Sequence, residues 1–440
     1  MFDSPGFIQN KLAIGAVVVA FGGAAFLLLS SNATIISPAS APAPAAGGPT
    51  TPPDNIATGT DTAPASSVPT FSPAARVAGT IVPDLPDQSP LSNPPEIVKG
   101  IYLTNWTAGS SKRLASLIGL LDRTELNAMV IDIKDYSGYL AYRTGIPLAV
   151  SAGAEREIRI LRPNAMLKEL HDKGIYVIGR ITVFQDPLLA AAHPEWAVKN
   201  TATGKVWTDR KGISWLDAAA TPVWDYHVEI ARDALRRGFD EINFDYIRFP
   251  SDGDLEVTGY PFWNEAEPRH QVVARFFNYT RQELSGAKIS ADLFGLTTGA
   301  EGDLGIGQVI EDAYRAFDFV SPMVYPSHFA AGHAGFQNPA AHPYEVIELS
   351  MTKALERLVK LELLAAGINA TSTEIAPVSG RFARLRPWLQ AFNLGATYDA
   401  AKINAQILAT EKALGSGTTS GHYAGWLLWD PNNNYANYHP

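Results

Sequence analysis

Carboxylate side chains interrupt two short apolar runs in the middle of this chain. Asp245 lies within NFDYIRFP (243–250), and Asp292 lies within ISADLFG (289–295). A carboxylate is rarely buried in an apolar run unless it is paired or takes part in chemistry. Two such groups at neighbouring strand ends suit nucleophilic and acid–base catalysis, so we take Asp245 and Asp292 as the catalytic candidates. The alternatives are a structural Asp–Arg pair for Asp245 and a loop cap for Asp292.

Aromatic, acidic and basic residues occur at the ends of the same and similar runs. The candidates for binding a substrate are Tyr102, Trp106, Asp132, Lys134, Asp135, Arg180, Arg248, Tyr325, Trp429 and Asp430. Aromatic faces stack on sugar rings and polar groups bind their hydroxyls, so this mixture favours a carbohydrate ligand. Core packing is the alternative for each aromatic residue, and a buried ion pair with Lys134 or Arg180 is the alternative for Asp132. Because strand side chains alternate, Arg248 is expected on the opposite side from Asp245.

Eight short apolar runs alternate with helical patterns, which predicts a parallel (β/α)8 barrel, a TIM barrel. The expected strands are Gly100–Trp106, Ala128–Lys134, Ile175–Val183, Glu241–Phe249, Lys288–Phe294, Phe317–Tyr325, Glu374–Val378 and Gly425–Trp429. In such a barrel the carboxyl ends of the strands meet at one rim, where active sites lie. The candidate residues therefore converge even though they are far apart in the sequence.

The N-terminal part of the chain has a different character. Leu12 to Leu29 is an uncharged stretch of 18 residues, just long enough to span a membrane as a helix. Lys11 precedes it, which predicts a cytoplasmic N-terminus and an exported remainder. The alternative is a signal peptide cleaved near Ser31-Asn32-Ala33. We expect an anchor or signal peptide over 1–33, a disordered Pro/Ala/Ser/Thr-rich linker over 34–95 and the barrel over 96–440.

Composition excludes several classes of protein. The net charge is −9, which argues against a nucleic-acid partner. The chain has no cysteine, so disulfides, thiolate nucleophiles and cysteine-ligated zinc are excluded. His328 and His333 are five residues apart in a Gly/Ala loop and match no metal motif, and no phosphate-binding loop or serine elbow is found. We therefore expect neither a metal nor a cofactor.

Five motifs give the chain a family resemblance. They are GFDEINFDYIRFPSDG (238–253), ISADLFG (289–295), SPMVYPSHF (321–329), LRPWLQAF (385–392) and GWLLWDPNNNY (425–435). In this order they resemble a glycosyl hydrolase-like (β/α)8 domain family of the wider alpha-amylase and alpha-galactosidase-like grouping. The resemblance implies that Asp245, ending strand four, is the nucleophile and that Asp292 is the nearest match for the acid/base. Ile247 stands where family 18 chitinases carry their acidic glutamate, which argues against a chitinase mechanism.

These observations together predict a glycoside hydrolase that acts on an envelope or extracellular polysaccharide. We expect it to be held by a single membrane span with its barrel outside the cytoplasm, or to be secreted if the N-terminus is cleaved. The alternatives are a non-catalytic carbohydrate-binding barrel and a carbohydrate deacetylase.

Overall fold

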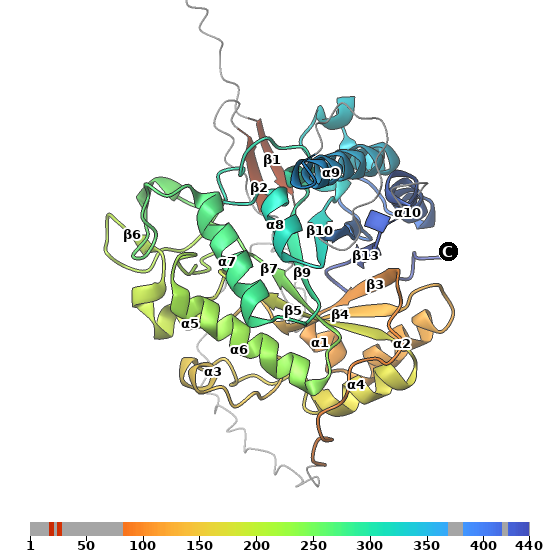
Figure 1. The fold of residues 1–440 in the computed structure, drawn as a ribbon, viewed down its shortest axis with the longest axis horizontal. Helices are drawn as coiled ribbons and strands as arrows, with labels where there is room; N and C mark the ends of the chain where they lie inside the picture. Colours follow the sequence, from red (N-terminus) through yellow and green to blue (C-terminus); the bar gives the residue numbers. More distant parts are fainter. Residues whose placement is uncertain (1–16, 22–23, 29–81, 368–381, 416–420, 440) are drawn as a thin grey trace, which may run out of the picture.

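A computed structural model describes residues 17–21, 24–28, 82–367, 382–415 and 421–439 (Figure 1). Parallel strands form a closed barrel in which β13 pairs with β3 and β9 pairs with β10. In chain order they are β3 (Val98–Leu103), β4 (Ala128–Lys134), β5 (Tyr176–Thr182), β7 (Glu241–Asp245), β9 (Ile289–Phe294), β10 (Phe319–Met323), β11 (Arg384–Leu385) with β12 (Trp388–Gln390), and β13 (Gly425–Trp429). The predicted eight-stranded parallel barrel is confirmed, with β11 and β12 together in the seventh position.

The seventh strand was predicted in the wrong place. Glu374–Val378 lies outside the described residues, and the seventh position of the barrel is held by β11 and β12. Arg386 and Pro387 separate these two pieces, and proline has no N–H group to donate to a neighbouring strand. The resulting two- and three-residue strands are too short to show an apolar alternation in the sequence.

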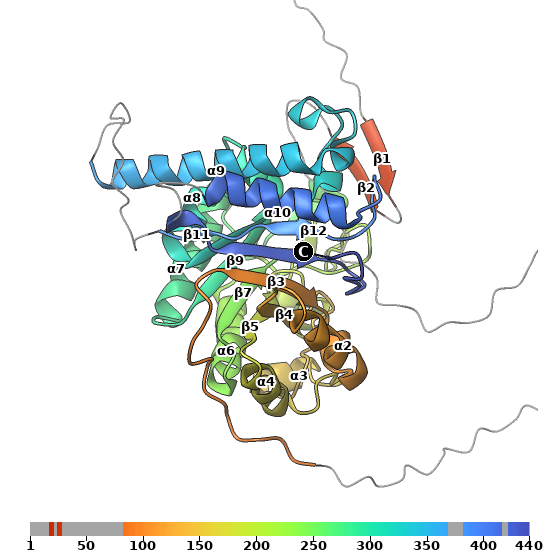
Figure 2. The ribbon, with the colours of Figure 1, turned by 90° about the vertical axis from the view of Figure 1, so that its right-hand side faces the viewer.

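Helices surround the barrel, with α6 and α7 along the outside of β7 and β9 (Figure 1). They are α1 (Asn105–Ala108), α2 (Ser111–Leu121), α3 (Pro147–Ala152), α4 (Pro163–Asp172), α5 (Pro187–Ala192), α6 (Thr221–Arg237), α7 (Arg269–Glu283), α8 (Ile310–Ala316), α9 (Pro343–Ala365) and α10 (Ala400–Leu414). Two short strands, β6 (Lys199–Asn200) and β8 (Thr258–Gly259), pair in the loops. The long helices α9 and α10 lie side by side over one flank (Figure 2).

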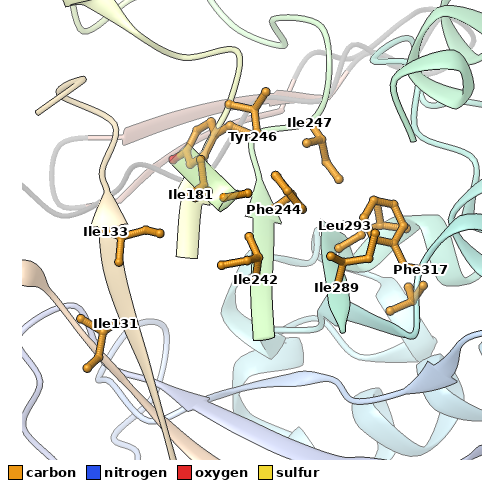
Figure 3. Packing of buried hydrophobic residues seen from close by; sticks show 14 of the residues in the cluster. Ile131, Ile133, Ile181, Ile242, Phe244, Tyr246, Ile247, Ile289, Leu293 and Phe317 are labelled. Atoms are coloured by element: carbon orange, nitrogen blue, oxygen red, sulfur yellow. The ribbon is translucent and has the colours of Figure 1, made fainter. Parts of the chain in front are cut away.

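Strand side chains alternate between the outer layer and the barrel interior. Ile131, Ile133, Ile242 and Phe244 belong to the large cluster between strands and helices, part of which Figure 3 shows. A second cluster inside the barrel contains aromatic and aliphatic residues of the intervening positions, such as Ile178. Every second side chain of a strand points into the barrel. Polar residues at these inward positions on neighbouring strands must therefore meet inside the barrel.

The described N-terminal residues differ from the predicted helix. Within Leu12–Leu29, β1 (Val17–Phe21) and β2 (Ala24–Leu28) pair as antiparallel strands, and the rest of that stretch lies outside the described residues. In the part of the chain that the structure describes, no helix combines the length and apolar character needed to cross a membrane. The membrane anchor therefore stays a prediction.

Part of the predicted linker contacts the barrel. Asp84 accepts hydrogen bonds from the backbone N–H groups of Asn164 and Ala165 at the start of α4, both at 3.0 Å. Leu91 donates its N–H to Asp240, which directly precedes β7, at 2.6 Å. Residues 84–91 thus bind the end of the barrel where the strands begin, opposite the rim where the candidate residues lie.

An ion pair closes the barrel interior near that end. Glu241 on β7 and Arg386 between β11 and β12 form a pair whose side chains are both 0% exposed. The Tyr176 hydroxyl also donates to Glu241, at 3.2 Å. A buried pair is costly to break because the remaining charge has no water and no partner.

We predict that Arg386→Leu lowers the free energy of unfolding by about 3–5 kcal/mol, since it leaves Glu241 charged and buried. The double variant Glu241→Gln/Arg386→Leu should recover a large part of that loss because it removes both charges. Chemical denaturation of the three proteins measures the difference. Equal losses for the single and double variants would contradict a paired role for these residues.

Candidate active site

The guanidinium group of Arg180 is the centre of the site. Arg180 points inward from β5, and its Nη1 donates to Asp132 on β4 at 2.5 Å. Its Nη2 donates to Asp245 on β7 at 2.5 Å, and its Nε lies 3.8 Å from a carboxylate oxygen of Asp292 on β9. Three carboxyl groups from three strands therefore surround one cation, and the two catalytic candidates lie beside the same group.

Asp292 is the most deeply placed of these carboxyl groups, with 1% of its surface exposed. Its Oδ1 accepts hydrogen bonds from Asn243 Nδ2 and Trp388 Nε1, both at 2.8 Å. Burial and the nearby charge of Asp245 raise its pKa to about 8, although Arg180 opposes the rise. This raised pKa favours the protonated form of Asp292 at neutral pH, and Oδ2 is the oxygen that these two donors leave unoccupied.

Asp245 ends β7 because the chain turns sharply at the next residue. Tyr246 has a φ of 54°, which is rare for a large side chain and typical of functional sites. In this conformation the Tyr246 N–H donates to Asp245 Oδ1 at 2.6 Å. The predicted strand Glu241–Phe249 is therefore too long at its end, and the turn presents the Asp245 carboxylate at the barrel mouth.

Asp132 forms the other side of the site. The Tyr102 hydroxyl donates to its Oδ2 at 2.5 Å, while Arg180 holds its other oxygen. Burial raises the pKa of Asp132 to about 6, against the opposing effect of Arg180. The C-terminal segment supports this arrangement, because the Tyr435 hydroxyl donates to the Tyr102 carbonyl at 2.7 Å. The buried pair between Asp132 and Arg180 that the sequence left open is thus present.

Aromatic residues line the rim next to the carboxyl groups. The rings of Tyr325 and Trp429 lie 4.9 Å apart at 30°, and Phe392 meets Trp429 edge-on at 5.0 Å. Tyr325 is buried, whereas Trp429 is half-buried. Trp106, which is 51% exposed, instead contacts the guanidinium of Arg159 at 4.3 Å from its ring. Of the aromatic residues predicted to stack on a sugar, Tyr325 and Trp429 therefore lie together at the rim. Trp106 instead packs against Arg159.

Lys134 is the last residue of β4, and its ammonium group bonds to residues at the end of β5 and just beyond it. It is 0% exposed, donates to the Thr182 carbonyl at 2.7 Å and pairs with Asp186 at 2.9 Å. The pairing of β4 with β5 shifts in register between Asp132 and Lys134, so the regular alternation stops here. Its ammonium group is therefore occupied inside the protein.

Arg248 is also buried, with 1% of its surface exposed. Its guanidinium lies over the rings of Trp215 and Phe294 at 4.7 and 4.6 Å, and donates to the Phe249 carbonyl at 3.0 Å. It does not join the group around Arg180. Because β7 ends at Asp245 and the chain turns at Tyr246, the regular alternation on which the sequence interpretation relied does not extend to Arg248.

Two further acidic candidates stabilise backbone turns. Asp135 accepts from Asn105 Nδ2 at 3.0 Å and from the backbone N–H of Ser137 at 2.9 Å. Asp430 follows β13 and accepts from the backbone N–H of Asn432 at 2.6 Å. Both lie at the ends of barrel strands, yet their described hydrogen bonds are with the loops that follow β3, β4 and β13.

Sequence reasoning missed Asn243 and Trp388, the two donors to Asp292. Asn243 precedes Asp245 by two residues on the same strand, so its inward direction followed from the alternation. Trp388 lies within LRPWLQAF, which was noticed as a motif but not placed on a strand. The misplaced seventh strand explains why Trp388 was overlooked.

The raised pKa of Asp292 predicts a pH-dependent stability. Folding raises this pKa from 3.8 to about 8, so the folded state holds a proton that the unfolded state releases, and stability falls as pH rises between these values. Asp292→Asn removes this titration, and it should lose less stability than the parent over that range. Denaturant unfolding at a series of pH values measures the slope, with exposed Asp172→Asn as the control. Parallel pH profiles for all three proteins would show that Asp292 does not hold this proton.

Known structures with similar chains include three from different bacteria. A hypothetical protein from Ruminiclostridium thermocellum is 41% identical over 44% of this chain and 96% of its own, with a TM-score of 0.40. The PgaB (BpsB) glycoside hydrolase domain from Bordetella bronchiseptica is 14% identical over 77% and 94%, with a TM-score of 0.48. The alpha-galactosidase TtGalA from Thermus thermophilus is 13% identical over 81% and 61%, with a TM-score of 0.46. No curated protein matches the chain.

A protein-family model matches nearly the whole barrel. The family described as "Putative glycosyl hydrolase domain" matches residues 100–435, from β3 to the segment that follows β13. This span contains all five motifs on which the resemblance was predicted. The protein therefore belongs to this family of glycosyl hydrolase-like domains.

Proposed function

We propose that this protein hydrolyses a glycosidic bond in an envelope or extracellular polysaccharide, with Asp245 as nucleophile and Asp292 as acid/base. The observation that carries the proposal is the pair of unequal carboxyl groups beside Arg180. Asp292 holds a proton at neutral pH, and Asp245 is bonded to a cation. A two-carboxylate glycosidase needs one protonated and one ionised group at the same pH.

The two carboxyl groups lie beside the same guanidinium. Arg180 contacts Asp245 at 2.5 Å and lies 3.8 Å from Asp292, so both carboxyl groups lie within reach of one planar group. Retaining enzymes place their carboxyl groups about 5 Å apart and inverting enzymes about 6.5–9.5 Å apart. We favour the retaining version, in which Asp245 itself attacks the sugar.

In the first step, an oxygen of Asp245 forms a bond to the anomeric carbon while the bond to the leaving oxygen breaks. Asp292 donates its proton to that oxygen, so the leaving group departs as a neutral alcohol. In the second step, water attacks the anomeric carbon, Asp292 accepts a proton from it, and Asp245 is released. Arg180 donates to Asp245 and positions its carboxyl group for the attack.

The remaining residues of the site suit a sugar ligand. Asp132 and Tyr102 present oxygen atoms that can bind sugar hydroxyls, and Arg180 is a donor. The half-buried ring of Trp429, beside Tyr325, offers an apolar face at the same rim. Rings and polar groups at one rim are the combination that carbohydrate recognition requires.

Asp245→Asn should lower the rate of hydrolysis by about a thousandfold or more, since the amide cannot form the covalent intermediate. The side chains have similar volume, so the melting temperature should change little. A screen of envelope and secreted glycans by mass spectrometry identifies the substrate, and turnover is then compared with that of Asp172→Asn. Near-normal turnover of the Asp245→Asn protein would exclude this assignment, and glycan binding without cleavage would favour a non-catalytic barrel.

Asp292→Asn should cost about 10²–10⁴-fold in rate with a poor leaving group, because that group must be protonated as it departs. The loss should shrink with an activated leaving group such as nitrophenol, which needs little protonation. The rate of the parent enzyme should fall as pH rises past about 8, where Asp292 loses its proton. The pH–rate profile of the Asp292→Asn variant should lack this fall at high pH. A loss independent of the leaving group would transfer the acid role to Asp132, whose pKa is raised to about 6.

We also propose that the barrel acts outside the cytoplasm, tethered by the apolar stretch Leu12–Leu29. Full-length protein should then sediment with membranes, and limited proteolysis within 34–81 should release a soluble barrel. Fractionation with N-terminal sequencing tests this expectation. Recovery of a soluble protein that begins near Thr34 would replace the anchor by a cleaved signal peptide.

A further inference from the structure

A cavity of about 270 Å³ lies beside the barrel mouth, outside the group around Arg180. It is enclosed by the turn Gly295–Thr298 that follows β9, by the segment that follows β10, and by α9. The lining residues are Leu296, Thr298, Gly299, Ala300, Leu304, Phe329, His333, Leu349, Ser350 and Lys353. Its volume is near the lower end of ligand sites, about 300 Å³, which suits one sugar ring rather than several.

The cavity adjoins the proposed active site through shared packing. Leu296 and Leu304 on its wall pack against a small buried cluster that contains Phe294, the last residue of β9. Met323 contacts this cluster and also the interior cluster that contains Tyr325. Packed side chains therefore connect the cavity wall with the interior of the barrel.

The lining of the cavity combines apolar and ionisable side chains. Leu296, Leu304 and Phe329 supply the apolar part. Lys353 and His333 are its ionisable lining residues, and no Asp or Glu is among them. In a chain with a net charge of −9, a ligand cavity without an acidic group favours an anionic partner.

His333 has a nitrogen atom that is available to a ligand. Its ring lies on Phe329, with centroids 4.1 Å apart, and its Nε2 is buried without a hydrogen-bond partner in the described part of the chain. Burial and then the charge of Lys353 lower its pKa, so the imidazole is neutral near pH 7 and can donate or accept one hydrogen bond. Buried polar atoms normally have a partner, so a bound molecule is a natural explanation.

Lys353 extends over the loop because Gly299 has no side chain. A Cβ atom at Gly299 would lie 3.3 Å from Lys353 Cδ and 3.5 Å from Nζ. The lysine stem thus lies against the loop that carries Thr298, with its ammonium group at the cavity. This arrangement places a positive charge at the cavity.

We propose that this cavity binds a carboxylate-bearing sugar residue of the polysaccharide, with Lys353 on the carboxylate and His333 on a ring hydroxyl. The apolar face of that sugar packs on Leu296 and Phe329. The inference rests on the proposed function, since the bound sugar belongs to the chain that Asp245 and Asp292 cleave. It assigns the enzyme to acidic rather than neutral polysaccharides.

The test uses a matched pair of probes, a trimer of 1,4-linked galacturonate and its full methyl ester, which differ in charge. Binding to the full chain carrying Asp245→Asn, which prevents turnover, is measured by calorimetry. We expect the acid form to bind at least tenfold more tightly than the ester. Lys353→Met should abolish this preference, whereas Lys360→Met, an exposed position on the same helix, should keep it.

A third variant separates charge from hydrogen bonding. His333→Phe keeps a ring against Phe329 but removes Nε2, so it should weaken both probes several-fold and leave their ratio unchanged. Equal binding of acid and ester, no binding of either, or an unchanged preference in Lys353→Met would overturn the inference. If the preference depends on Lys353 but the parent protein cleaves no glycan, the proposed function fails while the acidic-sugar site stands.

Discussion

The balance of charge around Arg180 determines the rest of the site. The guanidinium of Arg180 faces Asp132, Asp245 and Asp292, so three ionised carboxylates around this one cation would leave an excess of negative charge away from water. Such an excess is costly, and it is relieved most easily where burial is deepest. Asp292 is that place, and its raised pKa is the consequence. The unequal protonation that acid–base chemistry needs thus follows from having fewer cations than anions in a closed space.

The barrel brings the three carboxyl groups and Arg180 together because it determines which side chains point into its interior. Parallel strands with a period of two bring every second side chain inside, so Asp132, Arg180, Asn243 and Asp292 converge from four strands. The interior is polar at both ends, since the Glu241 pair with Arg386 lies toward the beginning of the strands. The interior between them contains aliphatic and aromatic residues such as Ile178, together with the hydrogen-bonded side chains of Asn243 and Ser290.

Alternation and strand direction explain what could be predicted from the sequence. Asp132, Arg180, Asp245 and Asp292 converge because topology alone brings the ends of their strands together. Lys134 could not be placed, because a shift in register after Asp132 turns it toward a buried partner. Registers, turns and interrupted strands depend on contacts that are distant in the sequence, and for the same reason the seventh strand and its Trp388 were missed.

Depth in the barrel, rather than residue type, differentiates the two aspartates. Asp245 stands at the strand end, where the turn at Tyr246 gives it a backbone N–H donor and Arg180 gives it a cationic donor. Asp292 is set into the interior, where Asn243 and Trp388 occupy one oxygen and leave the other to hold a proton. The neutral donors fix the orientation of Asp292 without supplying a full positive charge, so its proton is retained. Trp388 therefore connects the seventh strand, the least regular part of the barrel, to the chemistry proposed for Asp292.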